Sequence, residues 1–402
     1  MKRFVTLIIG IFWTYSISIA FGQNSVKDYS DFLNREHLSP KEYIFKLFET
    51  NDIIILGERD HRDTTQYDLI LDIISDERFI NNIGHIYTEV GVINRTDWAN
   101  NILKKQYSNN NEFEKELIKL YRELDFNPVW EKYNMYKYLK GVYGINKTLP
   151  NEKKLTIGLT DVEFDWNEMN ADKYANFMSF LYKEVAVIRD SIMALNFINL
   201  YEKQTPINGK RKALYIQSHS HAININVTVN NNRIKSVGHF LKEAYGENVK
   251  IVLINWYNFG GFYFMPKQKV SLVDGGKWDA AFELSNHKSI GFNLKESPFR
   301  ATQYFPYQKF KYQDVADGFI FYLPFYKFVC TIGMPKIIDE EFVEELLNRY
   351  VIVFGENNKR TKEIQKSPEK AKKMFTNYHN RVKSFNCCEN CRRLRREMKK
   401  WL

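Results

Sequence analysis

The stretch IIILGERDHRD, residues 53–63, passes directly from four apolar residues to a glycine and then to a run of ionisable groups. An unbroken run of isoleucine and leucine of this length is typical of a buried strand. A glutamate at the end of such a strand, here Glu58, needs a partner that offsets the cost of its desolvation. We therefore expect a central strand whose end contributes Glu58 and His61 to a site shared with other strands.

Further apolar runs of strand length follow along the chain, at residues 85–90, 154–161, 212–219, 249–256 and 317–324. Longer amphipathic patterns lie between or beside them, at residues 64–75, 94–106, 112–142, 168–203 and 235–246. Alternation of short apolar strands with helices is typical of α/β folds, in which helices cover both faces of a parallel sheet. The sequence thus predicts a central, mostly parallel sheet flanked by helices.

Two segments depart from this alternation. Residues 258–310 are rich in glycine and aromatic residues, which predicts a loop- and hairpin-rich insertion that caps the sheet. Residues 337–402 have helical patterns, many basic residues and three of the four cysteines. We expect one α/β domain over residues 23–336 and a helical, basic, cysteine-containing C-terminal extension over residues 337–402.

The N-terminus has the pattern of a secretory signal peptide. Lys2 and Arg3 precede an apolar stretch over residues 4–21, and the small residue Gly22 follows. We expect residues 1–22 to be removed on export, so that the mature protein is periplasmic or extracellular. The alternative is a single membrane anchor, because the stretch is just long enough to span a bilayer. No later stretch is long and apolar enough to do so.

The composition excludes a disordered chain, because 44% of the 402 residues are hydrophobic and 15% are aromatic. The formal net charge is +10. Much of this excess lies in the stretch CRRLRREMKKWL, residues 391–402, so it belongs to the tail more than to the fold. We expect no specific nucleic-acid partner.

Three of the four cysteines, Cys387, Cys388 and Cys391, lie close together in the tail, and Cys330 stands alone. With His379 they could bind zinc, although a second cysteine pair of the kind that makes such sites convincing is missing. In an exported chain, a local disulfide or a tail without a chemical role is the favoured interpretation. The sequence does not reveal their redox state.

Polar residues close four of the apolar runs. In the order of the chain they are Glu58 and His61, then Glu89, then Asp161, then Ser218, His219 and His221. Ligands of open α/β sheets bind outside the carboxyl ends of the strands, so we expect these side chains to share one site. The alternative is that Asp60, Asp63, Thr64 and Asp161 only cap the helices that follow.

The position of His61 just before a predicted helix suggests a general base. The positive end of the helix dipole would lower the pKa of His61 and keep its imidazole neutral. Glu58 or Glu89 could then hold the other ring nitrogen while His61 takes a proton from water, which suits hydrolysis. A divalent metal held by Glu58, His61, Glu89 and His221 is an equally open interpretation of these residues.

These motifs resemble the erythromycin esterase family. LGERDH (residues 56–61) matches its G-E-x-x-H pattern, and IYTEVG (residues 86–91) its glutamate at the end of the second strand. IRDSIMALN (residues 188–196) and QDVADGFIFY (residues 313–322) resemble a later helix and strand of that family. The resemblance extends over residues 50 to about 325, with the motifs in the same order.

The resemblance implies an α/β fold with a deep cleft in which water attacks the carbonyl of a small-molecule ester or lactone. His61 would be the general base, assisted by Glu58, with Glu89 and His221 in the same cleft. Substrate-binding or supporting roles would fall to His219, Arg189, Asn196 and Asp161.

The G-E-x-x-H opening also resembles haem-binding lipoproteins and the Tiki and TraB metal-dependent peptidase group. The second hypothesis is therefore a haem- or divalent-metal-binding protein, or a metal-dependent hydrolase or peptidase, that uses the same glutamates and histidines. A third is a catalytically silent interaction module with a basic tail. The sequence itself does not establish that a cofactor is bound.

Overall fold

The computed structural model describes residues 25–35, 38–129, 133–182, 187–229, 232–260, 269–388 and 390–402. The predicted signal peptide, residues 1–22, lies outside the described residues. Within them, no helix is both long and apolar enough to cross a bilayer.

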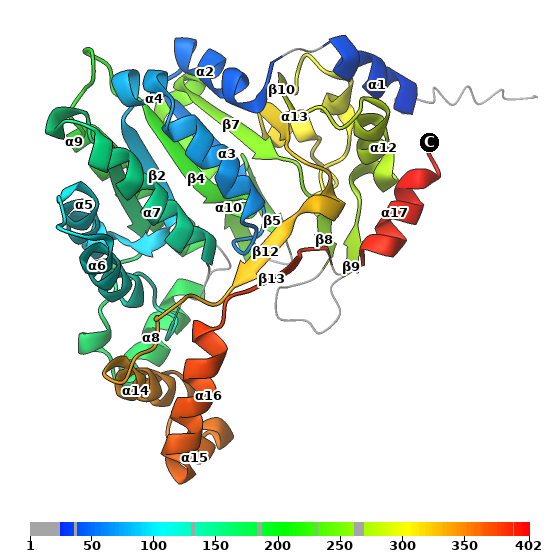
Figure 1. Cartoon of the computed structure of the whole chain (residues 1–402). Helices are drawn as coiled ribbons and strands as arrows, with labels where there is room; N and C mark the ends of the chain where they lie inside the picture. The colour runs from blue at the N-terminus through cyan, green and yellow to red at the C-terminus, as the bar shows by residue number, and fades with distance from the viewer. Residues whose placement is uncertain are drawn as a thin grey trace, which may run out of the picture.

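A seven-stranded sheet forms the centre of the molecule (Figure 1), with the strand order β10-β11-β7-β1-β4-β2-β3. Its members in chain order are β1 (Ile53–Glu58), β2 (His85–Val92), β3 (Thr156–Asp161), β4 (Ala213–Ser218), β7 (Val249–Ile254), β10 (Ile290–Asn293) and β11 (Gly318–Phe321). All neighbouring strands are parallel except β10 and β11. The predicted α/β fold with a mostly parallel sheet is confirmed.

Helices cover both faces of this sheet, which explains why all six residues of β1 are buried. Successive strand residues point to opposite faces, so Ile53 and Ile55 pack on one side and Ile54 and Leu56 on the other. The first side is covered by α1 (Val26–Arg35), α9 (Val187–Lys203), α11 (Val237–Tyr245) and α12 (Lys277–Leu284). The second is covered by α2 (Pro40–Thr50), α3 (Thr65–Ile74) and α7 (Tyr133–Thr148).

Smaller elements connect these layers. The remaining helices of this part are α4 (Glu77–Asn82), α5 (Thr96–Lys104), α6 (Asn110–Arg122), α8 (Ala171–Tyr182), α10 (His219–Ala222) and α13 (Tyr312–Val315). Three two-stranded pairs lie outside the main sheet: β5 (Asn226–Val229) with β6 (Asn232–Lys235), β8 (Asn258–Gly260) with β9 (Lys269–Ser271), and β12 (Val329–Ile332) with β13 (Lys383–Asn386).

Two predicted segments differ from the structure. The helix predicted over residues 112–142 is two helices, α6 and α7, because the intervening stretch contains Pro128, which cannot continue a helix. The insertion over residues 258–310 contains the β8–β9 hairpin, as predicted. It also contains helix α12 and strand β10, which joins the main sheet as its antiparallel edge.

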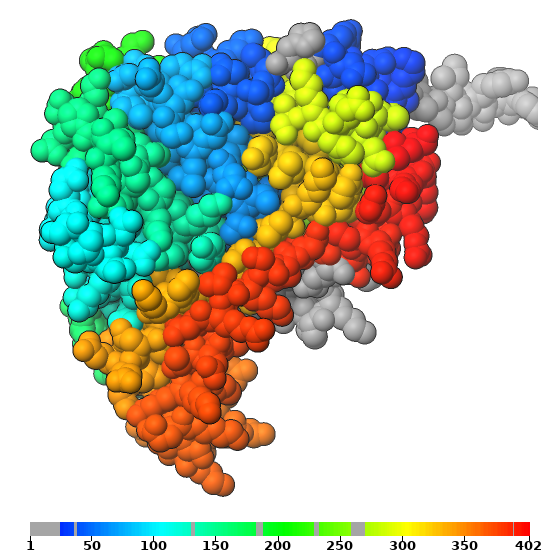
Figure 2. Space-filling view, in the orientation of Figure 1, coloured from blue at the N-terminus to red at the C-terminus, as the bar shows by residue number. Residues whose placement is uncertain are grey.

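The C-terminal part is helical, with α14 (Phe342–Phe354), α15 (Lys359–Lys366), α16 (Pro368–Asn380) and α17 (Cys391–Lys399). Coloured orange to red in Figure 2, it runs across the surface of the molecule. Within it, β13 pairs with β12, and Cys387 forms a disulfide with Cys330, 57 residues earlier. The predicted local disulfide is therefore wrong, and Cys387 is not available for a zinc site. Cys388 and Cys391 are free thiols.

Candidate functional site

Four neighbouring strands bring the predicted site residues to one edge of the sheet. Glu58, Asp161 and Ser218 are the last residues of β1, β3 and β4. Glu89 lies in an irregular part of β2, where the pairing with β3 slips between Thr88 and Val92. Such bulges re-aim side chains near functional sites. The carboxyl ends of β1, β4, β2 and β3 thus meet side by side, where ligands of α/β sheets bind.

At this edge the imidazole of His61 lies between two carboxylates. Its Nδ1 is 2.6 Å from Oε1 of Glu58, and its Nε2 is 3.0 Å from Oε1 of Glu89. The two glutamate side chains are only 1% and 4% exposed, whereas that of His61 is 23% exposed. The other oxygen of Glu89 accepts a 2.6 Å hydrogen bond from the backbone N–H of Ser218. We call Glu58, His61 and Glu89 the Glu–His–Glu cluster.

The charge state of His61 is opposite to the one predicted from the helix dipole. Burial alone would lower its pKa, but the carboxylates of Glu58 and Glu89 together raise the pKa of His61 well above its ordinary value. Two full negative charges in hydrogen-bonding contact outweigh the partial charge at the start of α3. His61 is therefore a stabilised imidazolium in the resting site.

The loop that carries His61 is held by its own polar residues. Asp60 accepts a 2.8 Å hydrogen bond from the backbone N–H of Arg62, and Asp63 accepts one of 2.9 Å from that of Thr65. Asp63 also forms a buried ion pair with Arg59, whose guanidinium Nε lies 2.7 Å from its Oδ2. Asp63 thus holds the start of α3, as the capping alternative predicted, whereas Asp60 holds the loop before it and the side chain of Thr64 makes no capping hydrogen bond.

His221 pairs with Asp190, a residue that the sequence analysis missed. Nδ1 of His221 is 2.8 Å from Oδ1 of Asp190, which is 2% exposed. The other carboxylate oxygen of Asp190 accepts from the backbone N–H of Val237 at 3.2 Å. Val237 is the first residue of α11, which packs closely against α10, the helix that carries His221. This approach requires Gly238, since a Cβ there would lie 1.9 Å from the backbone oxygen of Ala222. The position of Asp190, directly after Arg189 in the helix motif, is a signal that could have identified it.

Electrostatics couple this pair to the Glu–His–Glu cluster. Burial would raise the pKa of Glu89, but His221, His61 and Arg189 together lower it, so Glu89 remains ionised. Burial would lower the pKa of His221, and the charges of Asp190 and Glu89 raise it instead. Negative and positive groups thus alternate along this edge of the sheet.

Asp161, Arg189 and Asn196 brace the end of β3. Arg189 binds the carboxylate of Asp161 through two contacts, of 2.9 Å from Nε and 2.6 Å from Nη2. The side-chain amide of Asn196 donates to the backbone oxygens of Thr160 and Asp161, at 3.0 and 3.1 Å. Arg189 thus holds the side chain of Asp161, and Asn196 holds the backbone at the end of β3. Both contacts support the strand end beside the cluster.

His219 lies in a different environment. Its ring is 5.9 Å from that of Trp256 and 6.3 Å from that of Tyr304. Burial lowers the pKa of His219 to about 4, so its imidazole is neutral. Its buried Nε2 has no hydrogen-bond partner among the residues that the structure describes.

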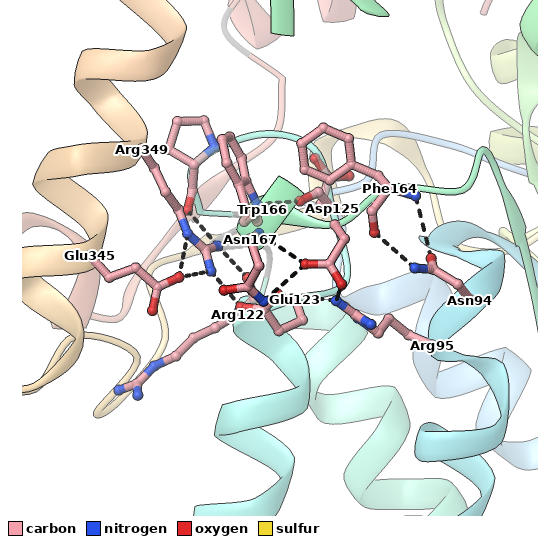
Figure 3. A network of polar contacts seen from close by, with 12 residues as sticks. Asn94, Arg95, Arg122, Glu123, Asp125, Phe164, Trp166, Asn167, Glu345 and Arg349 are labelled. Atoms are coloured by element: carbon pink, nitrogen blue, oxygen red, sulfur yellow. Dashed lines mark hydrogen bonds and ion pairs between the residues drawn. The ribbon is translucent and has the colours of Figure 1, made fainter. Parts of the chain in front are cut away.

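A polar network joins the segments that follow α6 and β3 to α14, in the C-terminal part of the chain (Figure 3). Arg349 of α14 is 1% exposed and forms ion pairs with Glu123 and Glu345. Nearby, Asp125 accepts a 3.1 Å hydrogen bond through its backbone oxygen from the indole N–H of Trp166. Burial, together with the charge of Asp161, raises the pKa of the Asp125 carboxyl to about 6. No motif in the sequence singles Asp125 out.

The predicted ligand set does not fit a metal ion in this geometry. Both ring nitrogens of His61 already contact carboxylate oxygens, at 2.6 and 3.0 Å. Within the described ranges, no group of three or more His, Cys, Asp or Glu side chains is arranged to hold a metal. We therefore derive no chemistry through a metal from these residues.

No family profile and no curated protein matches this chain. Several solved structures, however, match this chain. A Bacillus cereus protein has 10% identity and a TM-score of 0.45, over 74% of this chain and 97% of its own. The erythromycin esterase EreC has 11% identity and a TM-score of 0.45, over 72% and 95%. ChaN of Campylobacter jejuni, which binds haem, has 14% identity and a TM-score of 0.33, over 53% and 86%.

The structures found thus include an erythromycin esterase and a haem-binding protein. This likeness concerns the fold alone. At such identities, no activity is transferred from these proteins to this chain.

Proposed function

We propose that this chain is an exported hydrolase that uses water to cleave an ester or lactone of a small molecule. The observation that carries the proposal is the partly exposed imidazole of His61, held between the buried carboxylates of Glu58 and Glu89. A histidine with one ring nitrogen fixed by a carboxylate is the standard arrangement for a general base that acts on water.

In the proposed reaction the resting imidazolium of His61 first releases its Nε2 proton to solvent. Glu58 holds the remaining Nδ1–H, so that Nε2 is the basic atom. The weaker contact, 3.0 Å from Nε2 to Glu89, opens to admit the attacking water. As the water oxygen bonds to the ester carbonyl carbon, one of its protons passes to Nε2. The imidazolium then returns that proton to the leaving oxygen as the C–O bond breaks. Glu58 stabilises the imidazolium between these steps.

The tetrahedral intermediate of this reaction carries a negative charge on the former carbonyl oxygen. His221 and Arg189 are the cations whose charges already act on Glu89 at this edge. Asp190 holds His221 and Asp161 holds Arg189, so both cations are oriented before the substrate arrives. We assign to them the electrostatic stabilisation of the intermediate.

Export rests on the N-terminal pattern of residues 1–22. The Cys330–Cys387 disulfide supports it, because disulfides persist mainly in oxidising compartments such as the periplasm and the extracellular space.

A panel of aryl esters and lactones, assayed with the wild type and with His61→Ala, tests the proposal. Loss of the general base should lower kcat/KM by roughly 10²–10⁴-fold. His239→Ala is the matched control, because His239 is also paired with a glutamate and is 22% exposed, against 23% for His61. This control should keep the wild-type rate.

Equal rates in the wild type and His61→Ala would contradict the proposal, as would an absence of turnover across the whole panel. Metal content and an absorption spectrum of the purified protein complete the test. Stoichiometric zinc or manganese, or a Soret band, would favour the metal- or haem-binding hypothesis instead.

A further inference from the structure

The C-terminal helix α17 presents a strongly basic surface. Residues 390–402 contain six arginines and lysines and a single acidic side chain, Glu397. Leu394 and Met398 are 0% and 1% exposed and pack the helix against its neighbours. Because its apolar side is fixed in this way, the charged side of α17 faces outward.

Only part of this charge is used within the molecule. Arg393 forms an ion pair with Glu397, and the guanidinium of Arg395 lies 4.5 Å from the ring centre of Tyr326. The others, Arg392, Arg396, Lys399 and Lys400, are exposed. None of these four has an ion pair within the part of the chain that the structure describes. Three cations on α17, and Lys400 directly after it, therefore remain available to an external anion.

Exposed apolar side chains accompany these cations. Trp401 and Leu402, directly after the helix, are 42% and 51% exposed. The indole N–H of Trp401 donates a 2.8 Å hydrogen bond to the backbone oxygen of Gly275, which holds the ring at the edge of the basic surface. Arginine and lysine beside tryptophan and leucine are the composition of segments that lie in a membrane interface.

The start of the described chain lies at the same place. The hydroxyl of Tyr29, in α1, donates a 3.2 Å hydrogen bond to Asp274, the residue before the Gly275 that holds Trp401. Figure 1 shows α1, α12 and α17 together on one side of the molecule. The start and the end of the described chain thus lie side by side.

We propose that this surface, the α17 face (Arg392, Arg396, Lys399, Lys400, Trp401 and Leu402), binds the anionic headgroups of a lipid bilayer. The four cations match the charge of the headgroups, and the two apolar side chains enter the interface beside them. A soluble acidic polymer would account for the cations but not for the exposed Trp401 and Leu402. The bilayer is therefore the partner that fits all six residues.

Vesicle flotation of the full chain tests this proposal, with phosphatidylcholine vesicles compared with vesicles of equal parts phosphatidylcholine and phosphatidylglycerol. Every variant is compared in the same form of the chain, so the readout is the gain in binding caused by the anionic lipid. Each basic residue near an anionic surface contributes roughly fivefold in affinity, so the triple variant Arg392→Gln, Arg396→Gln, Lys399→Gln should lose about a hundredfold. High salt should weaken the wild type in the same direction.

The control is a triple variant with the same loss of charge on distant helices: Lys362→Gln, Lys366→Gln and Lys370→Gln, all exposed on α15 and α16. It should bind as the wild type does. Equal losses in the two triple variants would overturn the proposal in favour of a net-charge effect, and so would a wild type that does not distinguish the two vesicle types. Unchanged vesicle binding by Trp401→Ala, with heparin bound as tightly as vesicles, would assign the face to an acidic polymer.

Discussion

At the scale of single residues, the neighbours of each histidine decide its charge. His61 and His221 each contact a buried carboxylate, which raises the pKa of both. His219 lies among aromatic rings without such a partner, and burial lowers its pKa to about 4. The site therefore combines two histidines whose charged form is favoured by carboxylates with one whose neutral form is favoured by burial. The proposed chemistry requires His61 to give up its Nε2 proton before it acts on water.

Replacing Glu58 by Gln tests this account of His61. The variant keeps the shape of the side chain but removes the charge 2.6 Å from Nδ1, so the pKa of His61 should fall below its wild-type value. Titration of the imidazole resonances by NMR measures the change, and the resonances of His239 provide an internal control. A wild-type His61 that titrates at or below 6.5 would contradict the assignment.

The same shifts determine how the cluster affects stability across pH. The pKa of His61 is raised on folding, so its pairing stabilises the fold fully below 6.5 and less as the pH rises through the folded value. The pKa of Glu89 is lowered, so its pairing stabilises the fold above 4.5 and less as the pH falls towards its folded value. Both contributions are therefore present in mildly acidic solution.

At the scale of elements, strand β12 holds the loop that carries His61. The backbone N–H of Thr64 donates to the oxygen of Val329, and that of Thr331 donates to the oxygen of Arg62, both at 2.8 Å. Between these bonds, Cys330 forms an isolated bridge with Asp63. Because Cys330 is also bonded to Cys387 and β12 pairs with β13, the C-terminal tail reaches the site loop through one strand.

This connection predicts that the double variant Cys330→Ser, Cys387→Ser is destabilised. The disulfide closes a loop of 57 residues, and loss of such a cross-link costs roughly 2–5 kcal/mol of unfolding free energy. Urea denaturation of the oxidised protein measures the difference. Cys391→Ser, which removes a free thiol, should unfold at the wild-type midpoint. A double variant that also kept the wild-type midpoint would show that the cross-link contributes nothing to stability.

At the scale of the whole molecule, six of the seven strands of the sheet correspond to the apolar runs in the sequence. They could be predicted because long stretches rich in Ile, Val, Leu, Tyr or Phe are buried on both faces. Strand β10 was missed because its four residues, Ile290–Asn293, include a glycine and lie in a segment of loops. Its place at the sheet edge depends on antiparallel pairing with β11, which no local pattern encodes.

For the site, the sequence predicted which residues lie at this edge of the sheet, but not the contacts between them. Parallel strands place Glu58, Glu89 and Asp161 there whatever their contacts are. That both nitrogens of His61 are held by carboxylates depends on the order of the strands, because β4 separates β1 from β2. The partnership of His221 with Asp190 and that of Cys387 with Cys330 likewise arise from tertiary packing.

The pH dependence of kcat/KM, measured on the best ester of the panel, tests the central claim most directly. If His61 is a general base held between two carboxylates, only its deprotonated form is active, so the rate should rise with pH up to the point at which His221 loses its charge. The midpoint should lie above 6.5, the ordinary value for histidine, and should move down in Glu58→Gln. A rate that is independent of pH, or a midpoint at or below 6.5, would contradict the account.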